Sequence, residues 1–234
     1  SYHLTLPRSR KPFIFIHRQL KIRDIAVFLH EVGHAFELFT LEGEILDFNR
    51  QFSGEYSEMI ALVFEVLSTN HWEVFFEGED LVKAKFLYFD NLISSLSWIC
   101  AIEELQIWAY QQESIALHDL KHFWRTLLAE YGLPNDKSEE SSFEHLWHRQ
   151  FHIFEMPFSF NDYAYAIIGA IDYFLKYNAL PSGEAIAKLK EAILRRDAGI
   201  FFEPGIVFEP QHIERLISQM TDYLLENTHY VEPK

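Results

Sequence analysis

The chain has 234 residues, 49% of them hydrophobic and 24% charged, which is enough apolar material for a buried core and excludes a disordered chain. Its formal net charge of −15 disfavours binding to nucleic-acid phosphates and to anionic membrane surfaces. The single cysteine, Cys100, excludes an internal disulfide and a multi-cysteine zinc site, so any metal ion would need histidine and carboxylate ligands.

Predicted elements are mainly helical, because glycine and proline are scarce and helical periodicity covers most of the chain. The apolar, β-branched segment 12–17 predicts one edge strand of a small sheet near the start. Helices are expected over 22–41, 55–69, 81–113, 115–131, 143–151, 159–177, 183–196 and 210–226, and segment 81–113 can form one long helix or two. The first of them is apolar on almost every face, so we expect it to be buried on most sides. The polar stretch 134–142 predicts a connector within a single domain, 1–234.

Targeting and membrane signals are not found in this sequence. No apolar run approaches the roughly 18 residues of a membrane-spanning helix. The basic segment 1–11 is not followed by the apolar core of a signal peptide. We therefore predict a cytoplasmic protein that has no membrane and no nucleic-acid partner.

The strongest chemical signal is the HExxH pattern of His30, Glu31 and His34. Positions four apart share one face of a helix, so both imidazoles can reach one ion, while Glu31 lies about 100° away and can lean over its open side. The surrounding residues are apolar, and burying ionisable groups among them costs several kcal/mol unless a partner or a metal satisfies them. The segment therefore predicts a hydrolytic metal site.

A catalytic zinc ion usually takes three protein ligands and a water molecule, so a third ligand is expected from another buried helix. Glu58 and Glu65 are isolated among apolar residues of helix 55–69 and lie seven positions apart, on one helical face. We predict that Glu58 binds the metal. Glu65 either orients a ligand imidazole from behind or is a satisfied polar residue between two helices.

These two segments, with Ala35 completing the first, resemble the HExGHA and E-x-x-[AS]-x-x-F/N-E motifs of the oligoendopeptidase F and thimet oligopeptidase family of zinc peptidases. Segment 12–15 looks like the strand that precedes the family's zinc helix, and segment 152–163 is similar to its H-x-x-x-x-P-F element. The resemblance implies a mainly α, gluzincin-type catalytic lobe with a small β edge. It implies one zinc ion per chain on His30, His34 and Glu58, with Glu31 as general base.

By the same resemblance, His152 and Tyr163 would hydrogen-bond the tetrahedral intermediate. The sequence departs from the family at three points. Ser159 stands where a tyrosine is common, so Tyr163 or Tyr165 must serve, and Tyr165 is a candidate substrate contact. His17 replaces a usual asparagine. Family members are much longer, so we expect either the C-terminal catalytic portion of a longer protein or a natural short form with a more open site.

The function expected from these features is a zinc endopeptidase that hydrolyses short peptides through a metal-activated water. One alternative is a di-iron helical oxidoreductase, because Glu31-x-x-His34 and Glu226-x-x-His229 both have the spacing used in such bundles. Glu58 and either Glu103 or Glu104 would supply its further carboxylates. Another is a non-catalytic peptide-binding piece of the peptidase fold.

Two other candidate sites, the His118 and His122 pair and Cys100, are predicted to have no chemical role. His118 and His122 are also four apart, but polar neighbours predict an exposed face without a metal. Cys100 lies in an apolar run without a base nearby, so we expect a packed, unreactive side chain rather than a nucleophile.

Overall fold

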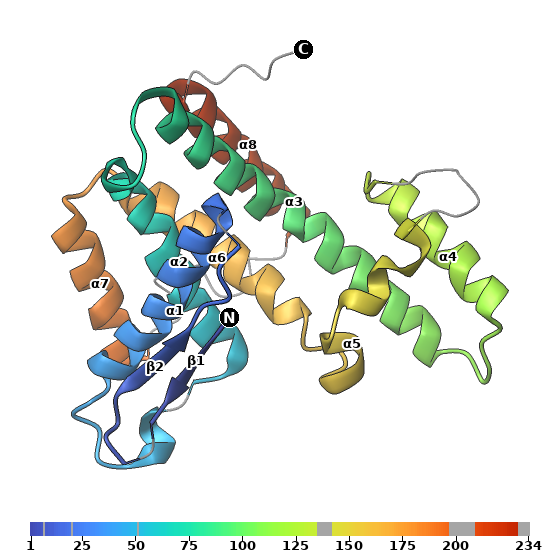
Figure 1. The fold of residues 1–234 in the computed structure, drawn as a ribbon, viewed down its shortest axis with the longest axis horizontal. Helices are drawn as coiled ribbons and strands as arrows, with labels where there is room; N and C mark the ends of the chain where they lie inside the picture. Colours follow the sequence, from blue (N-terminus) through green and yellow to red (C-terminus); the bar gives the residue numbers. More distant parts are fainter. Residues whose placement is uncertain (7, 20, 51, 135–141, 197–208, 229–234) are drawn as a thin grey trace. The chain divides into compact units, whose positions relative to one another are not determined.

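The computed structural model describes residues 1–6, 8–19, 21–50, 52–134, 142–196 and 209–228 (Figure 1). Its strands and α-helices, in chain order, are β1 (Tyr2–Thr5), β2 (Pro12–Phe15), α1 (Ile22–Thr40), α2 (Gly54–Ser68), α3 (Gly78–Tyr110), α4 (Leu117–Glu130), α5 (His152–Glu155), α6 (Asn161–Tyr177), α7 (Ser182–Arg195) and α8 (Pro210–Thr228). Its 3-10 helices are η1 (Asp47–Arg50), η2 (Thr69–Val74) and η3 (Ser142–Arg149). The prediction of a mainly helical chain with a small strand element near its start is confirmed.

The chain divides into two compact units. The first contains Ser1–Asp90 and Tyr165–Lys234, and the second contains Asn91–Ala164. Helices α3 and α6 each contribute residues to both units. The single catalytic domain predicted over 1–234 stays a prediction, and most of the predicted connector 134–142 lies outside the described residues.

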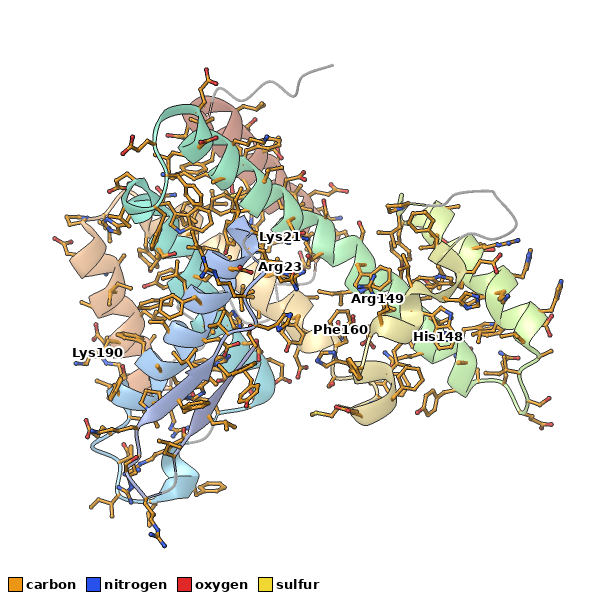
Figure 2. All side chains as sticks on the ribbon, in the orientation of Figure 1. Lys21, Arg23, His148, Arg149, Phe160 and Lys190 are labelled. Atoms are coloured by element: carbon orange, nitrogen blue, oxygen red, sulfur yellow. The ribbon has the colours of Figure 1, made fainter. Side chains whose placement is uncertain are left out.

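Helix α1 begins where an acidic side chain satisfies backbone donors. The Asp24 carboxylate accepts hydrogen bonds from the backbone N–H groups of Gln19, at 2.8 Å, and Lys21, at 3.3 Å. A negative charge in the first turn also interacts favourably with the helix dipole. Figure 2 labels Lys21 and Arg23 at this end of α1. The turn therefore fixes the start of the helix that carries the HExxH pattern.

Helix α1 is not buried on most sides, so that prediction is wrong. It packs against α2, α7 and the two strands, and its fully buried residues are Ala26, Glu31, Gly33, Ala35 and Glu37. Phe28 and Phe39 remain 45% and 54% exposed. An apolar residue can lie at the surface of a folded unit, so an apolar sequence alone overstates burial.

The strand β1 was not predicted from the sequence. It pairs antiparallel with β2, and Tyr2 lies opposite Phe15 while Leu4 lies opposite Phe13. The basic residues that follow β1 obscured an alternation of apolar residues, Tyr2, Leu4 and Leu6, which is the period of a half-buried strand. This alternation places the side chain of His3 on the opposite face, where its ring stacks on His34.

The backbones of helices α1 and α2 approach each other closely at Gly33. A Cβ atom built at this glycine would lie 2.6 Å from the Cα atom of Ala61 and 2.8 Å from its carbonyl oxygen. Both contacts are to backbone, which cannot move aside as a flexible side chain can. The small residues at this crossing therefore let the backbones of the two helices meet.

We expect Gly33→Ala to lower the free energy of unfolding by roughly 1–3 kcal/mol, because the added methyl group forces the helices apart. Urea denaturation of the metal-free protein measures the change. Gly43→Ala is the control, since a Cβ atom there meets nothing within 4 Å, and its effect should stay within about 0.5 kcal/mol. Equal effects at the two positions would contradict the close packing of α1 on α2.

An aromatic cluster joins helices α3, α6 and α8 within the first unit. Phe89 of α3 lies with its ring 5.2 Å from Phe174 of α6 and 6.4 Å from Tyr223 of α8, and Phe174 lies 5.2 Å from Tyr223. Edge-on and tilted contacts at these distances are favourable for aromatic rings. The rich aromatic content of the sequence is thus used as core, as in many globular proteins.

In the second unit, the segment predicted as a short helix over 143–151 is instead the 3-10 helix η3, followed by the single turn α5. Contacts to α4 hold its first turn. Trp124 donates its indole N–H to the Phe143 carbonyl at 2.9 Å, and the buried Glu144 carboxylate pairs with Lys121 and Arg125. Short segments tied in this way often adopt the tighter winding.

Cys100 is exposed, which contradicts the expectation of a packed side chain. Its neighbours Ile99, Ala101 and Ile102 take the buried face of α3, so Cys100 is turned outward. Partial burial of the thiol and the nearby carboxylates of Glu104 and Glu103 nevertheless raise the pKa of Cys100. A raised pKa reduces the thiolate population, which agrees with an unreactive side chain.

Within the described ranges, no helix combines the length and the apolar character needed to cross a bilayer.

Candidate metal centre

The structure brings His30, His34 and Glu58 together on two neighbouring helices of the first unit. The Nε2 atom of His30 lies 3.2 Å from Glu58 Oε2, and the Nε2 atom of His34 lies 3.8 Å from Glu58 Oε1. One ligand atom from each of the three residues can be chosen so that all lie within 4.8 Å of one another. In the part of the chain that the structure describes, no other group of three or more such side chains meets this test.

Local structure explains this convergence. His30 and His34 are one turn apart on α1 and share a face, and Gly33 between them allows the backbone of α2 to approach. Glu58 lies in the second turn of α2, so its carboxylate can reach across to α1. Two imidazole nitrogens and one carboxylate oxygen form a donor set of catalytic zinc sites, which leaves a position for water or substrate. The residues present therefore fit a zinc ion.

The pKa values of the two imidazoles are shifted in opposite directions. Burial by itself lowers the pKa of His30, but hydrogen bonds and charges from Glu58 and Glu65 outweigh it and raise the pKa to about 10. Burial and the neighbouring charge of His30 lower the pKa of His34 to about 4. The excess of carboxylate around His30 makes this a site that favours a cation.

Glu65 lies behind His30, with its Oε2 atom 3.0 Å from His30 Nδ1. The sequence left open whether Glu65 orients an imidazole or only fills a helix interface, and the structure places it on the imidazole. A carboxylate at Nδ1 fixes the ring and directs the other nitrogen forward. The pKa of the buried Tyr88 is raised by burial and by the neighbouring Glu65.

Glu31 is buried beside the three candidate ligands, with only 7% of its surface exposed. Burial raises the pKa of its carboxyl group, against the influence of the nearby His30. It lies one position along α1 from His30 and so faces a different direction from the His pair. Its predicted role as general base stays a prediction.

Three residues near this centre were missed by sequence reasoning. Ser57 and Glu37 lie behind His34, and the ring of His3 stacks on His34 with 5.8 Å between centroids. Glu37 carried a usable signal, because it is an isolated carboxylate among apolar residues, as Glu58 and Glu65 are. Ser57 had no comparable signal, since serine is common at the start of a helix.

His152 and Tyr163 lie together in the second unit. His152 opens α5, and its ring is 5.4 Å from Tyr163 and 5.0 Å from Phe160, which is labelled in Figure 2. The side-chain amide of Gln150 donates to His152 Nδ1 at 2.6 Å, and Trp98 donates to the oxygen of the same amide at 3.2 Å. The acceptor role of Nδ1 leaves the proton of a neutral His152 on Nε2.

The roles given to His152, Tyr163 and Tyr165 stay predictions. Tyr163 lies in the first turn of α6, which begins at Asn161, two residues after Ser159 and so close to the predicted start. Tyr165 belongs to the first unit.

Glu31, His34 and Glu58, which the di-iron alternative also uses, lie together, but its second Glu-x-x-His pair is not seen in the described part of the chain. Glu226 is on α8, and His229 lies outside the described residues. Glu103 and Glu104 have partners within the second unit, because the Gln106 amide donates to Glu103 and the Tyr131 hydroxyl donates to Glu104.

His118 and His122 are exposed on α4. No group of metal ligands is found there among the described residues.

Solved peptidase structures share this fold. Pz peptidase A, solved with an inhibitor, matches with a TM-score of 0.82 over 96% of this chain and 41% of its own, at 22% identity. A protein assigned as an oligoendopeptidase F matches with a TM-score of 0.79 over 99% of this chain and 41% of its own, at 21% identity. Another, from Bacillus anthracis, matches at 0.74 over 96% of this chain and 38% of its own, at 20% identity.

Comparison with family profiles and with curated proteins finds no match. The chain spans about two fifths of the length of the solved peptidases that it resembles. The motif resemblance and the structural likeness lead to the same group of proteins. The chain therefore has the helical peptidase fold found in oligoendopeptidase F and Pz peptidase, as its motifs predicted.

Proposed function

We propose that this chain is the catalytic part of a zinc-dependent endopeptidase that hydrolyses short peptides. The observation that carries the proposal is the convergence of His30, His34 and Glu58 within 4.8 Å, beside the buried Glu31. The peptidase fold supports the substrate class, because the solved structures that share it are named peptidases. A cytoplasmic location and peptide partners belong to the same proposal.

His30, His34 and Glu58 would hold the zinc ion. When bound, zinc would lower the pKa of a water ligand to about 7 and polarise the carbonyl of the scissile peptide bond. Glu31 would accept a proton from the attacking water and donate it to the amine that leaves. Because burial raises the pKa of Glu31, the carboxylate is better matched to taking and returning a proton near neutral pH.

His152 and Tyr163 would stabilise the negative charge that develops on the carbonyl oxygen. The Gln150 amide occupies Nδ1 of His152, so a neutral His152 has an N–H group at Nε2 to donate. Hydrogen bonds of this kind strengthen as charge develops, so they support turnover more than binding. Tyr165 would contact the substrate.

The proposal is tested by metal content and peptide cleavage. We expect one zinc ion per chain by elemental analysis after extensive dialysis, and cleavage of short peptides that stops when a chelator removes the metal. Two iron ions per chain would instead favour the di-iron oxidoreductase. Zinc without cleavage of any peptide across a range of lengths would favour the non-catalytic, peptide-binding alternative.

Tyr163→Phe is expected to lower kcat by roughly 10²-fold while zinc content and KM change little, because it removes one donor and almost no volume. Steady-state kinetics on a short peptide measures both constants. Tyr165→Phe is the matched comparison. A rate that falls with Tyr165→Phe and not with Tyr163→Phe would mean that the two tyrosines have been assigned in the wrong order.

A further inference from the structure

Ser57 links His34 to a second buried carboxylate. Its Oγ atom lies 3.3 Å from His34 Nδ1 and 2.7 Å from Glu37 Oε2. Ser57 immediately precedes Glu58 in α2, and Glu37 follows His34 by three residues on α1. The three side chains therefore form a chain of contacts on the side of His34 that faces away from Glu58.

The direction of these hydrogen bonds follows from counting protons. A serine hydroxyl has one hydrogen to donate, and an ionised carboxylate can only accept. While Glu37 is ionised, the Ser57 proton therefore goes to Glu37, at the shorter of its two contacts. The Ser57 oxygen can then accept a hydrogen bond from His34. His34 donates this bond only if its Nδ1 atom carries a proton.

A histidine that binds a metal ion must have a neutral imidazole, in which one nitrogen carries a proton and the other has a lone pair. With the proton on Nδ1, the lone pair of His34 is on Nε2. The Nε2 atom is the one that lies 3.8 Å from Glu58 Oε1 and belongs to the candidate metal centre.

His30 reaches the same arrangement by a different route. Its Nδ1 atom contacts the Glu65 carboxylate directly at 3.0 Å, and its Nε2 atom lies 3.2 Å from Glu58. Each imidazole therefore has an acceptor behind it, one direct and one through a hydroxyl.

Burial indicates that Glu37 is held by this link. It is 8% exposed on an apolar part of α1, where an unpartnered carboxylate would be costly. Among the described residues, Ser57 is the hydrogen-bond partner that the structure gives it. Burial raises the pKa of Glu37 to about 7, although the hydrogen bond from Ser57 opposes this shift. Removing Ser57 would therefore disturb both neighbours.

We propose that Ser57 and Glu37 are positioning residues that hold His34 in its Nδ1–H form, so that Nε2 is free to bind a divalent metal ion. The proposal rests on the metal site of the proposed function and adds to it the residues that prepare the second imidazole. They act through His34 and are not themselves placed against the metal or the substrate.

The first experiment measures zinc affinity by competition with a chromophoric chelator. We expect Ser57→Ala to weaken zinc binding by roughly 10- to 100-fold, as removal of partners behind a metal ligand typically does. Ser57→Thr keeps the hydroxyl and should restore most of the affinity. Ser95→Ala is the matched control, because that hydroxyl donates only to the Asn91 carbonyl of its own helix.

A double-mutant cycle separates a relay from two unrelated losses. Because Glu37 acts through Ser57, Glu37→Ala should weaken zinc binding, and adding it to Ser57→Ala should cause little further loss. Fully additive losses would overturn the relay.

The second experiment reads the tautomer without any metal. Two-bond proton–nitrogen correlation spectra of the metal-free protein, recorded at a pH above the pKa of Glu37, should show His34 protonated at Nδ1 in the natural sequence and a mixture of forms in Ser57→Ala. A natural protein with His34 protonated at Nε2 would overturn the proposal. Failure of the natural protein to bind zinc would instead overturn the proposed function, so the two failures can be told apart.

Discussion

Glu31→Gln is expected to abolish most peptide hydrolysis while leaving zinc content and fold intact. Glutamine has nearly the volume of glutamate, but its amide cannot accept the proton of water or return one to an amine. General acid–base groups typically contribute about 10²- to 10⁴-fold, so kcat/KM should fall by that amount. Zinc analysis, circular dichroism and peptide kinetics on the same preparation measure the three quantities.

Glu55→Gln provides the control for this change. Glu55 is a half-buried carboxylate in the first turn of α2, so removing its charge alters the local field without touching the buried Glu31. It should retain nearly full activity. Near-normal turnover in Glu31→Gln would mean that another group takes the proton, and it would end the proposed mechanism.

His34→Ala and Glu58→Ala are expected to lose the metal. Apparent zinc binding free energies of about 10–16 kcal/mol are shared among a few ligands, so losing one should weaken affinity by at least about 10²-fold. Elemental analysis and chelator competition measure this loss, and peptide cleavage should disappear with the metal.

His118→Ala tests whether a histidine pair at the same spacing elsewhere in the chain binds the metal. His118 and His122 repeat the four-residue spacing on α4, but they are exposed and belong to no group of metal ligands among the described residues. The variant should retain its zinc. If it lost zinc as readily as His34→Ala, the metal would have been placed in the wrong part of the chain.

The sequence was most informative where function depends on the period of one helix. The spacing of His30 and His34 predicts a shared helical face whatever surrounds the helix. The apolar neighbours of Glu58 indicated a second buried helix that carries a carboxylate. The helix boundaries also follow from local patterns, and α1 and α2 begin within one residue of their predicted starts. These features were accessible because each is decided within about twenty residues.

Features that depend on how helices pack were not accessible in this way. Ser57 and Glu37 become partners only because α2 is rotated so that one faces the other, and no single-helix pattern specifies that rotation. The register in which β1 pairs with β2 also depends on contacts between separate elements. The exposure of Phe28 likewise depends on which elements cover α1.

The contact of Gly33 with Ala61 has a thermodynamic consequence, because it brings together the two helices that supply the candidate ligands. Association of α1 with α2 and occupancy by the ion are then linked equilibria. At a free metal concentration one hundred times the dissociation constant, the folded state would gain about 2.7 kcal/mol. By reciprocity, a substitution that pushes the helices apart weakens metal affinity by as much as the ion would have strengthened their association. The absence of a side chain at Gly33 thus links the free energy of unfolding to the concentration of free metal ion.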